Sequence, residues 1–120
     1  MTFVFKELLK DIVDGLPGAA GAILADWEGE SVDFFFRGPD YDIKLLGAHH
    51  GILLNLAKEA SDNNGLGDIR ALMVSMGEHR VVVQPLKDGY YLVLLLDRGA
   101  NGGQALRVAG IAATRLIEEI

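Results

Sequence analysis

The sequence predicts an α+β domain built on a five-stranded, mainly antiparallel sheet, with the strand order 2-1-5-4-3 and helices on both faces. Helical and strand-like patterns follow one another in the order α-β-β-α-β-β-β-α. The strand-like runs 19–25 and 90–96 are apolar at nearly every position, as is typical of central strands covered on both sides. The chain has 120 residues, the length of one domain, which we assign to residues 1–120.

The first half of the chain predicts one helix and two strands. One helix face is formed by Phe5, Leu8, Leu9, Ile12 and Val13, and Gly15 and Pro17 end that helix. The buried run 19–25 is followed by a turn that contains Gly29. Apolar and polar side chains then alternate over 31–36, which predicts a strand, and Gly38 and Pro39 end it.

The second half predicts a long helix, a three-stranded meander and a final helix. The long helix spans about 41–61, and it carries two adjacent apolar rows that together form a wide apolar face. The rows are Leu45, His49, Ile52 and Leu56, and Leu46, Leu53, Ala57 and Ala60. The expected strands are 69–76, 80–85 and 90–97, and Asn101 or a neighbouring glycine caps the last helix.

Composition and charge exclude several classes of protein. Half of the residues are hydrophobic and 23% are charged, which excludes a disordered chain. The absence of cysteine excludes disulfide frameworks and thiolate metal sites. The net charge of −6 argues against nucleic acid as a partner, because phosphate contacts need clustered Lys and Arg. No apolar run approaches the roughly 20 residues that span a bilayer, and no export signal is present, so we expect a cytoplasmic protein without membrane insertion.

None of the patterns that could carry chemistry is complete. The glycine-rich segment 99–103 lacks both the dinucleotide spacing and the lysine of a phosphate loop. His49 and His50 are adjacent, so they point to different sides of a helix and cannot bind one metal together. A calcium loop that starts at Asp62 fails because its twelfth position is Met73. The sequence therefore predicts a protein that is not an enzyme, with no catalytic, cofactor-binding or metal-binding residues.

Two features predict a homodimer. The edge strand 69–76 is apolar on both sides, which favours pairing with another chain. The alternative is that the long helix covers one face of this strand and a terminal helix covers the other, so that only its edge is bare. Gly47 and Gly51 lie one turn apart in the long helix, where each glycine costs roughly 1 kcal/mol relative to alanine. Glycines at this spacing allow close packing, either on the chain's own sheet or against a second helix.

These features define an expected dimer interface and an expected partner surface. The interface residues lie on the long helix and on the edge strand: Leu46, Gly47, His49, Gly51, Leu53, Leu54, Leu72, Val74 and Met76. The residues assigned to partner binding are polar positions that we expect on the outward side of the same helix: His50, Asn55, Lys58 and Glu59.

Nearly the whole chain resembles the Roadblock family, the domain of Roadblock-type dynein light chains and of many bacterial and archaeal proteins. The resemblance is carried by residues 16–26, which read Leu-Pro-Gly and then a first strand that ends in Asp, and by the Glu28-Gly29 turn that follows. The meander 81–96 around Gly89 and the loop that holds Asn101 before the last helix are also similar to the family.

The resemblance implies a profilin- or longin-like fold and a non-enzymatic interaction module. Members of the family form dimers by joining sheets and pairing the middle helix, and prokaryotic members often bind small Ras-like GTPases. We therefore expect a homodimer that binds and regulates or scaffolds such a GTPase. Two alternatives stay open, namely a small-ligand sensor of the PAS or profilin type and a structural subunit of a larger complex.

Overall fold

Five strands form one sheet with the order β2-β1-β5-β4-β3, and every neighbouring pair is antiparallel. The computed structural model describes residues 3–120. The strands are β1 (Ala19–Ala25), β2 (Ser31–Phe36), β3 (Leu72–Ser75), β4 (His79–Pro85) and β5 (Tyr91–Asp97). The predicted order of strands is thereby confirmed.

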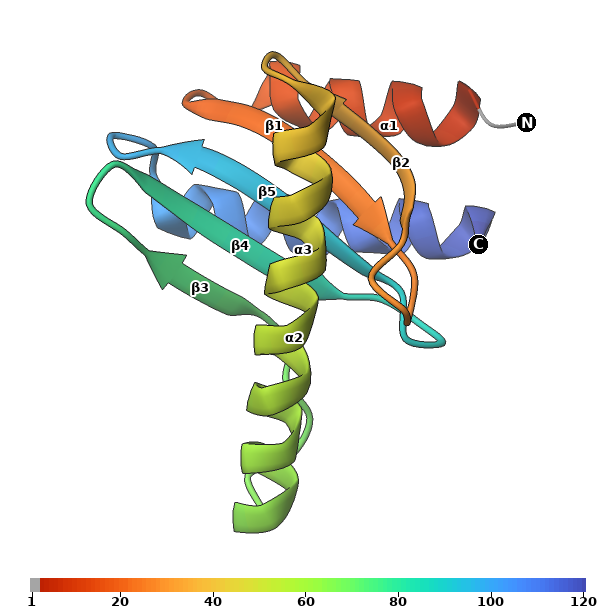
Figure 1. Cartoon of the computed structure of the whole chain (residues 1–120), viewed down its shortest axis with the longest axis vertical. Helices are drawn as coiled ribbons and strands as arrows, with labels where there is room; N and C mark the ends of the chain where they lie inside the picture. Colours follow the sequence, from red (N-terminus) through yellow and green to blue (C-terminus); the bar gives the residue numbers. More distant parts are fainter. Residues whose placement is uncertain (1–2) are drawn as a thin grey trace.

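Three helices cover the two faces of this sheet (Figure 1). On one face lie α1 (Phe3–Gly15) and α3 (Gly102–Glu119), and on the other face α2 (Asp40–Asn64) crosses the strands alone. Each face has its own hydrophobic core. Leu92 and Leu94 of β5 contribute to the core under α1 and α3, whereas Val93 contributes to the core under α2. The central strands β1 and β5 are therefore apolar on both sides, as the sequence predicted.

The edge strand β3 is shorter than predicted, because it covers Leu72–Ser75 and not 69–76. Leu72 pairs with Val83, so if the strand continued toward its N-terminal side, Arg70 would pair with Pro85. Proline has no N–H to donate to a ladder. The side-chain amide of Gln84 donates instead to the carbonyl oxygen of Arg70, at 2.9 Å, and the chain leaves the sheet there.

The long helix α2 runs three residues further than predicted and ends at Gly65. Gly65 has φ +63°, and the backbone N–H of Leu66 donates to the carbonyl of Ser61, which satisfies the last turn. The C-terminal part of α2 extends beyond the strands (Figure 1). The opposite cap, that of α3, follows the sequence prediction, because Asn101 Oδ1 accepts the N–H of Gln104 at 3.0 Å.

The two glycines of α2 let the helix lie directly on its own sheet. A Cβ atom at Gly47 would come within 2.9 Å of the Ile23 side chain, and one at Gly51 would overlap the Tyr91 hydroxyl. That hydroxyl donates to the carbonyl oxygen of Gly47 at 2.9 Å, and its burial, assisted by the nearby Asp26 carboxylate, raises the pKa of Tyr91. Close packing within the chain therefore explains both glycines.

We expect Gly51→Ala to lower the free energy of unfolding by about 1–3 kcal/mol, because the new methyl group overlaps a buried, hydrogen-bonded side chain. Gly110→Ala is the matched control, since no atom lies within 4 Å of the added Cβ in α3. That control should gain roughly 1 kcal/mol from helix propensity. Urea denaturation measures both changes, and equal stabilisation of the two variants contradicts the packing described here.

Candidate functional site

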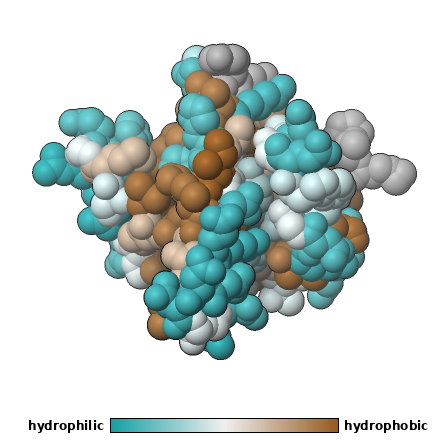
Figure 2. All heavy atoms as spheres, turned by 60° about the horizontal axis from the view of Figure 1, so that its bottom comes forward, coloured by the Kyte–Doolittle hydropathy of each residue, from teal (hydrophilic) through white to brown (hydrophobic). Residues whose placement is uncertain are grey.

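The outward side of α2 carries a stripe of large apolar side chains. Leu45 and Leu53 are each 40% exposed, and Ile52 and Leu56 are 59% and 57% exposed. We call these four residues the apolar stripe. They recur at helical spacing along one side of α2, and hydrophobic side chains gather in a band on this face of the molecule (Figure 2). Clustered exposure of this kind marks an interaction surface more often than scattered single residues do.

The side of α2 that carries Leu46 faces the β3–β4 corner of the sheet. A hollow of about 330 Å³ is lined there by Ile43 and Leu46 of α2, by Met76 of the β3–β4 turn and by His79, the first residue of β4. Leu72 of β3 packs in the same core as Leu46, so β3 presents Leu72 and Val74 on the face that α2 covers. We call the apolar stripe, the neighbouring Leu46 side of α2 and the edge strand β3 with Met76 together the α2–β3 surface.

The outer edge of β3 is open to another strand. Within residues 3–120, no side chain is hydrogen-bonded to the backbone of Leu72–Ser75. The strand is a template of unpaired backbone groups, and it has only four residues.

The opposite edge of the sheet is closed by the chain's own side chains. On β2, the N–H of Phe34 donates to Asp33 Oδ1 at 2.8 Å, and Lys6 Nζ donates to the carbonyl oxygen of Phe34. Lys6 also pairs with Asp33 at 3.2 Å and lies 4.5 Å from the centre of the Phe34 ring. Charged side chains on an edge strand prevent pairing with further strands. The two edges therefore differ: the backbone groups of β2 are bonded to side chains of the same chain, and the outer edge of β3 is open to another strand.

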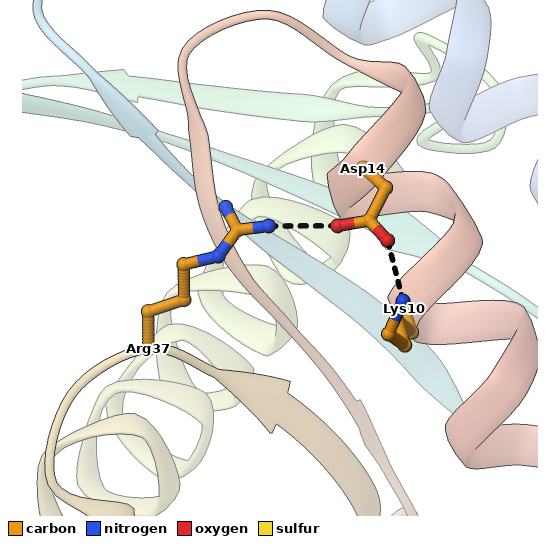
Figure 3. A network of polar contacts seen from close by, with 3 residues as sticks. All are labelled: Lys10, Asp14 and Arg37. Carbon is orange, nitrogen blue, oxygen red and sulfur yellow. Dashed lines mark hydrogen bonds and ion pairs between the residues drawn. The ribbon is translucent and has the colours of Figure 1, made fainter.

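A second group of ion pairs lies where β2 leaves the sheet (Figure 3). Asp14 of α1 accepts hydrogen bonds from Lys10 and from Arg37, each at 2.7 Å. The hydrogen bond from Lys10 is the main reason why the pKa of Asp14 is lowered, and the same bond raises the pKa of Lys10. Because these groups are exposed, the pairs add little stability. They join α1 to the end of β2 and have no catalytic geometry.

The structure brings six of the predicted interface residues to the α2–β3 surface. They are Leu46, His49, Leu53, Leu72, Val74 and Met76. The other three, Gly47, Gly51 and Leu54, face the chain's own sheet, so their assignment to the dimer interface is wrong. Of the two kinds of packing left open for the glycines, the structure shows packing on the chain's own sheet. The physical reason is that the glycines admit Ile23 and Tyr91 beneath the helix.

The prediction also missed three of the four residues of the apolar stripe, among them its two most exposed members, Ile52 and Leu56. Leu45, Ile52 and Leu56 belong to one of the two apolar rows that the sequence periodicity identified. The periodicity does not show which of these rows faces the sheet and which faces outward. The glycines were the available signal, because the side with the smallest side chains is the one that can approach a sheet most closely.

The expected partner residues separate in the structure. His50 is only 7% exposed, and its Nδ1 lies 2.9 Å from the carbonyl oxygen of Leu46, so the assignment of His50 to the outward side is wrong. His50 falls on the inward side because it lies between Gly47 and Leu54, three and four residues away. Asn55 and Glu59 are exposed and Lys58 is half-buried, and none of the three belongs to the apolar stripe.

The described part of the chain contains no cluster of three or more His, Cys, Asp or Glu side chains that could hold a metal ion. Within residues 3–120, no helix is long and apolar enough to cross a membrane. The described residues present an apolar stripe, an open strand edge and polar positions on the same helix.

This architecture defines a profilin-like α+β domain. Two solved structures of that class, complexes of LokiProfilin1 and LokiProfilin2 with rabbit actin, match the chain with TM-scores of 0.67 and 0.66, each at 16% identity. The first alignment covers 100% of this chain and 98% of the profilin, and the second covers both chains completely.

The chain belongs to the Roadblock/LC7 domain family, whose model matches residues 5–96. A Roadblock/LC7 domain from Streptomyces avermitilis superposes with a TM-score of 0.86 at 20% identity, covering 94% of each chain. MglC from Myxococcus xanthus superposes with a TM-score of 0.70 at 23% identity over the full length of both chains. No curated protein matches the sequence. At these identities the structures establish the fold.

Proposed function

We propose that this protein is a non-enzymatic homodimer that binds and regulates or scaffolds a small Ras-like GTPase. The observation that carries the dimer is the α2–β3 surface, where four large apolar side chains and an open strand edge lie together. Family membership supports the same assembly, because Roadblock domains dimerise by joining sheets and pairing the middle helix. MglB with a tetrameric arrangement has a TM-score of 0.86 to this chain at 17% identity, covering 98% of this chain and 88% of that one, so a protein of the same fold is found in a tetrameric arrangement.

A two-fold axis beside β3 accounts for both parts of the surface. Two copies of β3 can pair antiparallel and extend the sheet, and the same axis brings the two α2 helices together. Four residues of strand supply few hydrogen bonds, so burial of Leu45, Ile52, Leu53 and Leu56 provides most of the driving force. The strand then fixes the register of the two copies.

We expect Leu53→Lys to convert a dimer at micromolar concentration into a monomer, because a charge buried without a partner costs several kcal/mol. Leu106→Lys on α3 is the matched control, since Leu106 is 37% exposed and Leu53 is 40% exposed. Multi-angle light scattering gives the mass of each variant. Leu56→Lys, at a position 57% exposed, repeats the test where the folded monomer is perturbed less. A wild-type monomer, or equal effects of the α2 and α3 variants, contradicts the proposed dimer.

The GTPase partner is supported by the family resemblance and by the geometry of the dimer. Two copies of α2 beside one axis make a composite surface that no monomer has, and one partner lying across the axis excludes a second. Asn55, Lys58 and Glu59 are three polar residues of α2 that lie outside the apolar stripe. They are available to orient a partner after the dimer forms.

The GTPase hypothesis predicts that a pull-down from the source organism recovers a small GTPase together with this protein. Reversing both charges of the pair Lys58 and Glu59 should weaken binding of the purified GTPase by at least about threefold. The same double reversal at Arg115 and Glu118, both exposed on α3, is the control. Calorimetric titration with GDP-loaded and GTP-analogue-loaded partner measures the affinities. Recovery of the bait alone, or equal affinities for all three proteins, contradicts this role.

The alternative of a small-ligand sensor predicts a polar internal cavity. A hollow of about 720 Å³ between the end of α2, the segment before β3 and α3 is open at the surface, and charged and apolar residues line it together. This groove does not enclose a ligand, so the observations favour the interaction module. A structural subunit without a GTPase remains the outcome if the pull-down recovers other proteins.

A further inference from the structure

The only tryptophan of the chain is exposed on a rigid turn. Trp27 lies between β1 and β2 and is 59% exposed. The neighbouring Asp26 fixes the turn, because its Oδ1 accepts the N–H groups of Glu28 at 2.9 Å and Glu30 at 3.0 Å. The backbone N–H of Gly29, at φ +82°, donates to the carbonyl oxygen of Asp26. These hydrogen bonds fix the backbone conformation of the turn that carries Trp27.

The β4–β5 turn supports Trp27 from the side, and the two turns lie beside one another at the same end of the sheet (Figure 1). The ring of Tyr90 meets the indole edge to face, with centroids 5.5 Å apart and planes at 78°. Gly89 has φ +82°, and a Cβ atom there would come within 2.8 Å of Trp27 Cβ. An exposed tryptophan that is already ordered loses little entropy on binding, which is the property of an interface hot spot.

A pocket of about 110 Å³ lies between this turn and α2. Trp27 and Glu28 line one wall, and Ile52, Asn55 and Lys58 of α2 line the other. Asn55 and Lys58 are among the residues that sequence reasoning assigned to partner binding. The pocket reaches the apolar stripe only at Ile52, so a dimer formed on the β3 side leaves Trp27 accessible.

The charges beside Trp27 select the chemistry of the ligand. Glu28 lines the Trp27 pocket, and Glu30 lines a neighbouring hollow on the same turn, which Lys44 also lines. Both glutamates are exposed and form no ion pair within residues 3–120, whereas Asp26 already accepts two hydrogen bonds. An apolar ligand would desolvate these carboxylates without compensation, but a cation pairs with them. Lys58 of α2 also lines the pocket. A planar guanidinium can stack on the indole and donate two hydrogen bonds to a carboxylate, which an ammonium group cannot do.

We infer that Trp27, Glu28 and Glu30 bind an arginine side chain presented by a protein partner. This inference rests on the proposed function and deepens it, because it states what the partner's surface must carry. The guanidinium stacks on the exposed indole, and Glu28 and Glu30 supply the opposite charge. Asn55 and Lys58 then contact the partner from the α2 side.

The test uses three short peptides, acetyl-Gly-Arg-Gly-amide and its lysine and citrulline counterparts, titrated into the full chain. Because the protein has one tryptophan, its single indole N–H resonance reports directly on the site. We expect a saturable shift with the arginine peptide, at least about threefold weaker binding of the lysine peptide, and no saturation with the uncharged citrulline peptide. The double variant Glu28→Gln with Glu30→Gln should weaken arginine binding at least about threefold. The double variant Glu118→Gln with Glu119→Gln on α3 should leave it unchanged.

Equal shifts with the arginine and citrulline peptides overturn the inference. Equal binding of the arginine peptide by the Glu28/Glu30 and the Glu118/Glu119 glutamine variants also overturns it. Trp27→Leu, followed through the amide resonances of Gly29 and Gly89, should also abolish the response. If Trp27→Leu does not fold, the glutamine variants still test the inference, because they leave Trp27 and its turn unchanged. The titration needs neither a dimer nor a GTPase. If the protein binds the arginine peptide but the pull-down recovers no GTPase, the GTPase proposal is wrong and the arginine site stands. If the variant with both Glu28→Gln and Glu30→Gln binds a recovered GTPase as well as the wild type does, the GTPase proposal stands and the arginine site is wrong.

Discussion

The close approach of α2 to its sheet determines which surfaces the molecule can offer. Gly47 and Gly51 admit Ile23 and Tyr91 beneath the helix, and the Tyr91 hydroxyl donates to the Gly47 carbonyl. Once this side of α2 faces inward, helical geometry places Leu53 and Leu56 outward, where the sheet of the same chain cannot cover them. The exposed apolar stripe is thus a direct consequence of how the helix is seated.

The two edges of the sheet differ in whether they can accept another strand. Lys6 and Asp33 bond the outward backbone groups of Phe34 and close β2, whereas β3 carries no such side chains. An added strand is therefore blocked at one edge and accepted at the other, which is the edge beside the stripe. Trp27 and the polar flank of α2 lie at another part of the surface, so self-association and partner binding can use separate residues of one small domain.

Sequence reasoning recovered the fold more fully than the site. The order of strands followed from two runs that are apolar on both faces, since only central strands are covered on both sides. The length of β3 was overestimated because one proline in the neighbouring strand, Pro85, ends its ladder. His50 was placed outward and Leu54 was assigned to the dimer interface because two adjacent apolar rows do not reveal which one meets the sheet. Trp27 was missed because exposure in a turn leaves no periodic signal.

Concentration-dependent amide hydrogen exchange in β3 tests the central claim, that the α2–β3 surface is covered by a second copy. We expect the amides of Leu72–Ser75 to exchange slowly at high protein concentration and progressively faster on dilution, while those of the buried strand β5 stay protected throughout. Protection of β3 that is independent of concentration, or rapid exchange at every concentration, contradicts the account.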